Sequence, residues 1–246
     1  MSENGSVQSV ERVFLIIEAM CREKESSVTG LSKITGLNKT TVFRFLNTLV
    51  GLGYAVKNEK TECYSLTLKF LRISSRALAD YDIKKQMKPS LSRLSKDCGE
   101  TVHLVERNGA RVVYIDKFES DTNSVRMVSR IGMSLNIFTT AVGKAMLSNM
   151  SDSEIKDLWE NHTHNKKTEY TITALRDFLL EIEEIRKCGY AVDNEENELG
   201  VRCVAVAIPD QYGKYRYAVS VSAPINRMDD KTVKLTAQRL LELNKF

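Results

Sequence analysis

The side chains best suited to chemistry near the start of the chain lie on one helical segment, roughly residues 39–52. At about 100° per residue, Val42, Phe45, Leu46 and Leu49 fall on one apolar stripe that must pack on other helices. The opposite face offers a guanidinium for guanine, an amide for adenine, hydroxyls for phosphate and an aromatic ring for a thymine methyl. The residues of this free face and its flank are Lys39, Thr40, Thr41, Phe43, Arg44 and Asn47. We therefore expect the helix to lie in a groove of DNA.

An ordinary solvated helix face is the alternative for the same residues. Two features favour DNA. A phenyl ring such as that of Phe43 is poorly placed on a free face unless a partner covers it. The segment is also followed by a polar hairpin that carries Lys57 and Lys60, where a wing would contact phosphates. These two lysines complete the expected set of DNA-contacting residues.

The elements around this helix must hold it in place. Ser9 and Asn38 are suitable N-cap residues for the first and third of three helical patterns, and Gly36 suits a left-handed C-cap after the second. The polar segment 58–62 predicts a hairpin turn between two short strands. The expected helices span 9–24, 29–36 and 39–52, and the expected strands span 54–57 and 63–66. Three helices followed by a hairpin form a winged helix-turn-helix pattern.

From Glu100 onward, short strand patterns alternate with helical ones. The Asn108-Gly109 pair between two apolar runs predicts a β-hairpin. The expected strands span 102–105, 111–116, 125–129, 190–193, 203–208 and 215–222, and the further helices span 67–82, 85–98, 141–150, 152–159, 175–187 and 229–243. We therefore predict an α+β fold with a mainly antiparallel sheet in the second half. The expected division is residues 1–66, a linker helix over 67–84, and residues 85–246.

The composition is that of an ordinary globular chain. It has 246 residues, of which 42% are hydrophobic, and its net charge of +4 permits nucleic-acid binding without requiring it. Five cysteines without a C-x-x-C pair indicate a reducing compartment rather than a disulfide framework or a zinc site. The first residues lack a signal-peptide pattern, and the early apolar run 13–17 is too short to span a bilayer. We expect a cytoplasmic protein that contacts no membrane and needs no cofactor.

The histidines raise one further possibility, which is a metal-binding site. His162 and His164 lie two residues apart, but no third or fourth ligand lies nearby in the sequence. We therefore expect no metal, and we expect these two histidines at a solvated helix end.

Blocks in both halves of the chain match one known pattern. The first half contains VQSVERVFLIIEAM, TVFRFLNTLVGLGY and YSLTLKFL, and the second contains GETVHLVERNGARVVYIDK, SVRMVSRIG, TTAVGKAML, GYAVDNEENELGVRCVAVAI and SVSAP. In this order they resemble the IclR-type bacterial transcriptional regulators over nearly the whole chain. The TVFRFL and YSLTLK segments further resemble the KdgR-like branch of that family, which controls catabolism of 2-keto-3-deoxygluconate and related sugar acids.

The resemblance implies a GAF-like effector-binding and oligomerisation domain over residues 85–246. It places a small carboxylate or aromatic effector in a pocket on one face of the sheet. Backbone N–H groups at the start of the TTAVGKAML helix would face the ligand, which agrees with the positive end of a helix dipole. The residues implied at the pocket are Met127, Ile131, Thr140, Ala141, Val142, Asp193, Cys203, Ser220 and Ser222.

One loop departs from the family pattern. The family usually has Pro-Leu-His before the TTAVGKAML helix, whereas this chain has Asn136-Ile137-Phe138. Losing the histidine predicts one polar group fewer near the mouth of the pocket, and hence a different ligand from the usual ones.

The leading hypothesis is a ligand-responsive transcriptional regulator that represses a catabolic operon and senses a small carboxylate such as a sugar acid, with activation left open. Its partners would be double-stranded operator DNA, the effector and further copies of itself, as a dimer or tetramer. One alternative is an enzyme that acts on a small organic acid through the C-terminal pocket. The sequence contains no G-x-S-x-G, H-E-x-x-H or Rossmann glycine pattern to support it. A structural DNA-binding protein without an effector is the other alternative, and it leaves the second half unexplained.

Overall fold

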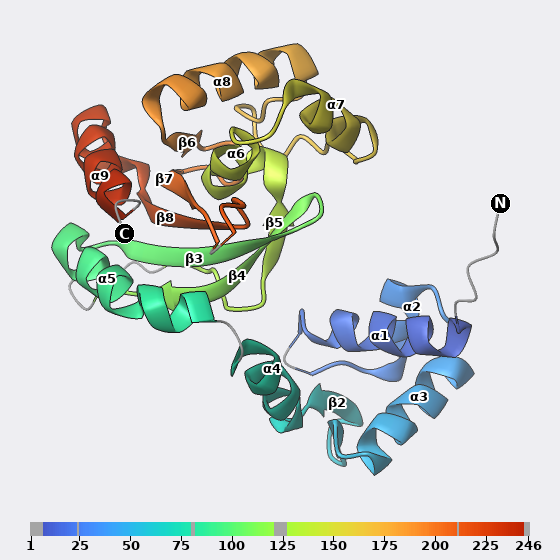
Figure 1. Cartoon of the computed structure of the whole chain (residues 1–246). Coiled ribbons are helices and arrows are strands. Elements are labelled where there is room, and N and C mark those ends of the chain that lie inside the picture. Colours follow the sequence, from blue (N-terminus) through green and yellow to red (C-terminus); the bar gives the residue numbers. More distant parts are fainter. Residues whose placement is uncertain (1–6, 24, 80–81, 121–126, 211, 244–246) are drawn as a thin grey trace. The chain divides into compact units, whose positions relative to one another are not determined.

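The computed structural model describes residues 7–23, 25–79, 82–120, 127–210 and 212–243 (Figure 1). The chain divides into two compact units, Met1–Asp80 and Tyr81–Phe246, and the boundary falls inside the expected linker segment. Each unit is built around its own cluster of buried hydrophobic residues. Within the described ranges, every helix is too short or too polar to span a membrane.

The first unit is a three-helix core with a two-stranded sheet beside it. The residues fully buried between the helices include Ile16, Leu31, Val42 and Leu46. Tyr64 of the second strand packs in the same core. The elements are α1 (Gln8–Met20), α2 (Val28–Thr35), α3 (Lys39–Gly51), β1 (Ala55–Asn58), β2 (Cys63–Leu66) and α4 (Lys69–Ala79). Because β1 and β2 pair antiparallel directly after the third helix, the predicted winged helix-turn-helix arrangement is confirmed.

Local capping explains where these helices begin and end. Asn38 Oδ1 accepts the backbone N–H of Thr41 at 2.8 Å, and Gly36 ends α2 at φ 72°, as predicted for both. The N-cap predicted at Ser9 is wrong. Helix α1 begins one residue earlier, with Val7 as an N-cap that makes no side-chain hydrogen bond. The first turn of α1 is thus exposed and has no side-chain cap at its N-cap residue.

The second unit is built on a six-stranded sheet with the order β5-β4-β3-β8-β7-β6. All neighbouring strands are antiparallel, which confirms the predicted sheet type. The strands are β3 (Thr101–Asn108), β4 (Arg111–Phe118), β5 (Ser134–Asn136), β6 (Ala191–Asn194), β7 (Val201–Ile208) and β8 (Tyr217–Pro224). The hairpin predicted at Asn108-Gly109 joins β3 to β4, and Gly109 supplies its positive φ of 60°.

Helices cover both faces of this sheet (Figure 1). On one face α6 packs on β6, β7 and β8 and contacts α8, which in turn packs with α7. On the other face α5 packs on β3 and β4, and α9 packs on β7 and β8. The helices are α5 (Asp82–Cys98), α6 (Ala141–Leu147), α7 (Asp152–Glu160), α8 (Leu175–Cys188) and α9 (Asp230–Glu242), with short 3-10 turns η1 (Ile137–Thr139) and η2 (Ile225–Arg227). Alternate strand residues therefore face different helical layers.

One predicted strand is wrong where the structure describes it. Residues 127–129, the described part of the strand expected over 125–129, are not in a strand. The Lys117 ammonium instead donates to the carbonyl oxygens of Met127 at 2.8 Å and Ser129 at 2.9 Å. The lysine side chain thus donates hydrogen bonds to carbonyl oxygens that would accept from a neighbouring strand if this segment were part of the sheet. Among the described residues, the sixth strand of the sheet is the short strand β5, which lies at the edge beside β4.

Candidate nucleic-acid interface and ligand cavity

Helix α3 separates its core side from its free side as its periodicity predicts. Val42, Leu46 and Leu49 are at most 4% exposed, and Phe45 is half-buried against the same core. Phe43 on the other side is 46% exposed. Of the remaining residues expected to contact DNA, the exposed ones are Lys39, Thr40, Arg44 and Asn47, and Thr41 is half-buried beside its cap. The arrangement leaves one polar helix face with an aromatic ring open to a partner.

The two lysines of the β1–β2 hairpin are not equivalent. The Lys57 ammonium lies 2.6 Å from a carboxylate oxygen of Glu62 and 3.6 Å from one of Glu59. The hydrogen bond to Glu62 is the main cause that raises the pKa of Lys57. Lys60 lies exposed at the turn of the same hairpin. Since Lys57 is already neutralised by its neighbours, Lys60 is the stronger candidate for a phosphate contact.

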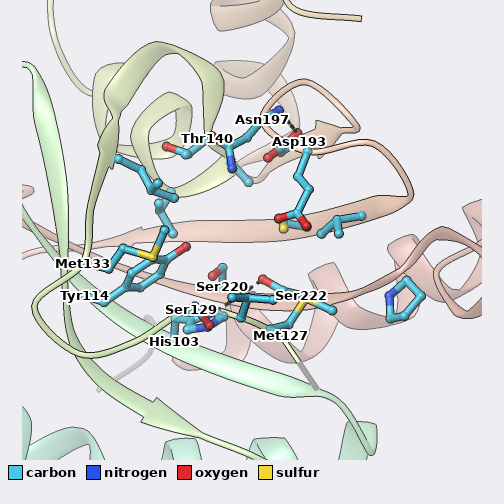
Figure 2. A pocket seen from close by; sticks show the side chains of 18 of the residues that line it. His103, Tyr114, Met127, Ser129, Met133, Thr140, Asp193, Asn197, Ser220 and Ser222 are labelled. Atoms are coloured by element: carbon cyan, nitrogen blue, oxygen red, sulfur yellow. Dashed lines mark hydrogen bonds between the residues drawn. The ribbon is translucent and has the colours of Figure 1, made fainter. Parts of the chain in front are cut away.

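A cavity of about 330 Å³ opens in the second unit between the α6 side of the sheet and the segment 127–133. Eight of the nine residues expected at an effector pocket line it, and Figure 2 shows most of them converging around the same space. They are Met127, Thr140, Ala141, Val142, Asp193, Cys203, Ser220 and Ser222. The ninth, Ile131, is not among the lining residues and is 49% exposed, so its predicted position at the pocket wall is wrong.

Several residues that line the cavity were not predicted from the sequence. His103, Tyr114, Ser129 and Asn197 also line the cavity (Figure 2). Strand register brings His103 opposite Ser220 on the adjacent strand. Side-chain alternation along β3 would have placed His103 on one face of the sheet, but the sequence does not reveal the register with β8.

His103 is a neutral polar group inside the cavity wall. It is 1% exposed, and its Nε2 lies 2.7 Å from Ser129 Oγ while its Nδ1 lies 3.4 Å from Ser222 Oγ. Burial, and secondarily the charge of Lys117, lowers the pKa of His103 to about 3. At neutral pH the imidazole therefore connects two hydroxyls without adding charge.

Asp193 is the buried acidic group of the cavity, at 4% exposed, and the exposed Glu198 is a second carboxyl group among the lining residues. Burial first, and then the nearby Glu196 carboxylate, raises the pKa of Asp193 to about 7. Its Oδ1 accepts the backbone N–H groups of Glu196 at 2.8 Å and Asn197 at 3.3 Å. Burial also raises the pKa of Tyr114 and Cys203, which keeps both neutral. The cavity wall is thus mostly apolar, with a few polar groups among its lining residues and no lysine or arginine among those that the structure describes.

Helix α6 approaches the cavity through a tightly packed first turn. Thr140 Oγ1 accepts the Gly143 N–H at 3.2 Å, so Thr140 is the N-cap. A Cβ at Gly143 would come within 1.8 Å of the Ile137 carbonyl oxygen, a contact that a larger residue cannot make. Below this turn the buried Lys144 ammonium pairs with Glu196 and, at 3.1 Å, with Glu181. Packing thus fixes the backbone of α6 against the turn η1 that precedes it.

Comparison with known proteins agrees with this two-part architecture. Residues 9–59 match the IclR helix-turn-helix domain, and residues 75–244 match the bacterial transcriptional regulator IclR C-terminal domain. The chain belongs to the IclR family. The predicted resemblance is thereby confirmed.

Two curated IclR relatives carry the name KdgR. The chain is 37% identical to the HTH-type transcriptional regulator KdgR of Escherichia coli K12, over 93% of this chain and 87% of the relative. It is 36% identical to the KdgR of Dickeya chrysanthemi, over 92% and 73% respectively. The crystal structure of the Thermotoga maritima IclR superposes with a TM-score of 0.75 at 31% identity and covers 95% of this chain and 94% of that one. The chain is therefore a KdgR-like IclR regulator, and its relatives are regulators rather than enzymes.

The departure from the IclR loop pattern acts on the core and not on the cavity. Phe138 is 1% exposed, and its ring lies 4.9 Å from that of Trp159 and 5.4 Å from that of Phe178. It is not among the lining residues, so the predicted loss of a polar group at the pocket mouth is wrong at this position. Asn136 Oδ1 accepts the Phe138 N–H at 2.8 Å, which caps η1. Phe138 therefore belongs to the apolar layer that packs against α7.

His162 and His164 follow the C-terminal end of α7, as expected, but both are half-buried. His164 stacks on the Trp159 ring at 3.7 Å, and its Nε2 is 2.8 Å from the Trp159 carbonyl oxygen. His162 is half-buried next to Phe138. They pack against the aromatic layer at this helix end instead of extending into solvent. Among the described residues, no group of three His, Cys, Asp or Glu side chains is arranged to hold a metal ion.

Proposed function

We propose that this IclR-family regulator represses a catabolic operon and that a small carboxylate such as a sugar acid releases it from operator DNA. The observation that carries the proposal is the convergence of eight predicted pocket residues on one cavity, in a different unit from the exposed face of α3. A DNA-binding surface and a ligand cavity in one chain are the two sites that a ligand-controlled regulator requires.

The cavity lining suits a hydroxylated monocarboxylate. The hydroxyls of Ser220, Ser222 and Tyr114 and the carboxyl of Asp193 can exchange hydrogen bonds with ligand hydroxyls. Lysine and arginine are absent from the lining residues that the structure describes. A ligand carboxylate would therefore be held by the backbone N–H groups of Ala141 and Val142 in the first turn of α6, since the N–H of Gly143 already donates to Thr140.

A homodimer or a tetramer would present two copies of α3 to half-sites about one helical turn of DNA apart, or multiples of it. Effector binding would then shift the balance between DNA-competent and incompetent arrangements, and a coupling of about 1–3 kcal/mol is sufficient for a large change in occupancy. Such a regulator meets its operator in the cytoplasm.

Titration of DNA fragments from the promoters next to the regulator's own gene, at several salt concentrations, tests the DNA-binding part. We expect specific binding with a linear salt slope on a logarithmic plot, and weakening of that binding when a sugar acid is added. Binding no tighter than to random DNA would overturn the regulatory role, and a sugar-acid panel without effect would overturn the ligand class.

Matched variants locate the effector in the cavity. Ser222→Val removes a buried hydroxyl from the lining, whereas Ile131→Ala changes a neighbouring residue outside it. We expect Ser222→Val to bind operator normally but to need about tenfold more effector for release, because a ligand hydrogen bond is lost. Ile131→Ala should respond as the parent protein does. Equal responses of the two variants would place the effector elsewhere.

A further inference from the structure

The carboxyl group of Asp193 has one oxygen that is fully used and one that is not. Oδ1 accepts the backbone N–H groups of Glu196 at 2.8 Å and Asn197 at 3.3 Å, and no partner for Oδ2 lies among the described residues. Some side-chain atoms in the described part of the chain are both unpaired and wholly enclosed, but Oδ2 of Asp193 is not one of them. Because Asp193 lines the effector cavity (Figure 2), Oδ2 therefore reaches the space that a ligand fills.

The wall of this cavity offers a ligand two carboxyl groups and no cation. The exposed Glu198 lines it together with Asp193, whereas lysine and arginine are absent from the lining residues that the structure describes. The buried ammonium of Lys144 does not line the cavity, and it is already paired with Glu196 and Glu181. A negatively charged ligand therefore meets carboxyl groups in the cavity, without a cation in the wall to balance it.

The cavity is also too small to keep like charges far apart. A compact space of about 330 Å³ is about 9 Å across, and Asp193 lies in its wall. Strand β6, which carries Asp193, packs on α6, whose residues Ala141 and Val142 offer N–H groups to a ligand carboxylate. Two carboxylates in such a partly buried site repel each other strongly enough to favour a proton on one of them. A protonated carboxyl group then donates a hydrogen bond to the other carboxylate.

We propose that the regulator takes up one proton on Oδ2 of Asp193 when it binds an acid effector, and that this carboxyl group donates a hydrogen bond to the effector carboxylate. The proton comes from the solvent, and the effector itself stays ionised. This inference rests on the proposed function, since it concerns recognition of the same ligand class. It adds that the affinity for the effector depends on pH.

Asp193 changes its protonation near neutral pH. Burial, and then the Glu196 carboxylate, raises the pKa of Asp193 to about 7, and a bound anion raises it further. Below about pH 7 the free protein already carries the proton, so the effector binds without further uptake. Above pH 7 the proton must be taken up on binding. The affinity then falls by about tenfold for each pH unit until the higher pKa of the complex is reached.

Titratable and charged groups face Asp193 from every element packed around it. Burial raises the pKa of Tyr114 and Cys203 and lowers that of His103 to about 3, so these three lining groups stay neutral between pH 6 and 8. The others are Glu196 and Glu198 in the turn after β6, Lys144 of α6 and Glu181 of α8. Burial also raises the pKa of Glu196, and its pairing with Lys144 opposes that rise. A variant of Asp193 itself is therefore needed to identify the group that takes up the proton.

Calorimetric titration of the full chain with D-gluconate at pH 6 and pH 8 tests the proposal. D-gluconamide is the matched probe, because its neutral amide can accept from a protonated carboxyl group or donate to an ionised one. We expect the Kd of gluconate to be about tenfold higher at pH 8 than at pH 6, and that of gluconamide to change by less than about twofold. Titrations at pH 8 in buffers of different ionisation enthalpy should show uptake of about one proton per gluconate bound.

Two matched variants assign the proton to one residue. Asp193→Asn places a group that donates a hydrogen bond at every pH and takes up no proton, and Glu198→Gln removes the other carboxyl group of the cavity wall. The ratio of the gluconate Kd at pH 8 to that at pH 6 should fall to about 1 in Asp193→Asn and stay at about 10 in Glu198→Gln. The proton count on the parent chain tests the uptake even where Asp193→Asn does not fold.

The outcomes separate this inference from the proposed function. Equal gluconate affinity at pH 6 and pH 8, or a pH dependence that persists in Asp193→Asn, would overturn the proton uptake and leave the ligand class standing. Absence of gluconate binding at about 10 mM at both pH values would count against the hydroxylated monocarboxylate, and against this inference with it. The operator titration remains an independent measurement of the regulatory role.

Discussion

Asp193 Oδ1 accepts the backbone N–H of Glu196 at 2.8 Å, and this one contact joins the two polar centres of the second unit. Asp193 lines the effector cavity, and the Glu196 side chain pairs with the buried Lys144 of α6. The first residues of α6 line the same cavity. A ligand that contacts Asp193 or α6 therefore acts on one connected group of buried polar residues.

Asp193→Asn should change how stability depends on pH. The pKa of Asp193 is raised from 3.8 to about 7 in the folded chain, so the folded state binds this proton more tightly than the unfolded state. The stability that the proton provides is complete below about pH 4 and is lost as pH rises through about 7. Thermal unfolding between pH 5 and 8 should show the parent chain losing stability relative to Asp193→Asn. Parallel pH profiles for the two proteins would contradict this assignment.

Lys144→Met should be strongly destabilising, by about 3–5 kcal/mol, because it leaves the buried Glu196 carboxylate without its partner. Burial alone would lower the pKa of Lys144, but Glu196 and Glu181 outweigh it and the net shift is upward, so the ammonium stays charged. The double variant Lys144→Met/Glu196→Gln should lose less free energy of unfolding than the two single variants lose together, as measured by urea unfolding. Lys187→Met serves as the control, since that lysine makes only surface ion pairs, and should show no measurable change.

Gly143→Ala should destabilise the second unit by about 3 kcal/mol or more, because the new Cβ would overlap the Ile137 carbonyl oxygen at 1.8 Å. Gly51→Ala provides a matched glycine in a helix. A Cβ there meets nothing within 4 Å, so the change should be neutral or stabilising by about 0.5 kcal/mol. Far-UV circular dichroism during urea unfolding measures both. A Gly143→Ala protein as stable as its parent would mean that α6 does not approach η1 this closely.

Alanine substitutions at three of the residues expected to contact DNA should affect operator binding in three different ways. Arg44→Ala should weaken binding by about 1–3 kcal/mol and relax preference at one base pair, since its guanidinium lies on the exposed face of α3. Lys60→Ala should weaken binding to all sequences and reduce the salt slope by about 1. Lys57→Ala should have the smaller effect on that slope, because Glu62 and Glu59 already pair with Lys57. A larger slope change for Lys57→Ala than for Lys60→Ala would show that DNA displaces those carboxylates.

The local patterns in the sequence were enough to predict the helices and hairpins. The stripe of α3 follows from spacing within one helix, and the β3–β4 hairpin follows from Asn108-Gly109 between two apolar runs. Both depend on residues close together in the chain, where backbone geometry leaves few alternatives. Family resemblance extended this to eight lining residues of the cavity, because those positions belong to whole matched blocks.

Only the tertiary structure decided which distant groups meet. His103 joined the cavity because β3 pairs with β8 in the register that puts it opposite Ser220, and Lys144 met a carboxylate 52 residues away. Phe138 turned into the aromatic layer, and Ile131 lay outside the cavity. A sequence specifies side-chain periodicity through local geometry, but contacts between distant segments depend on strand register and on which packing buries the most apolar surface.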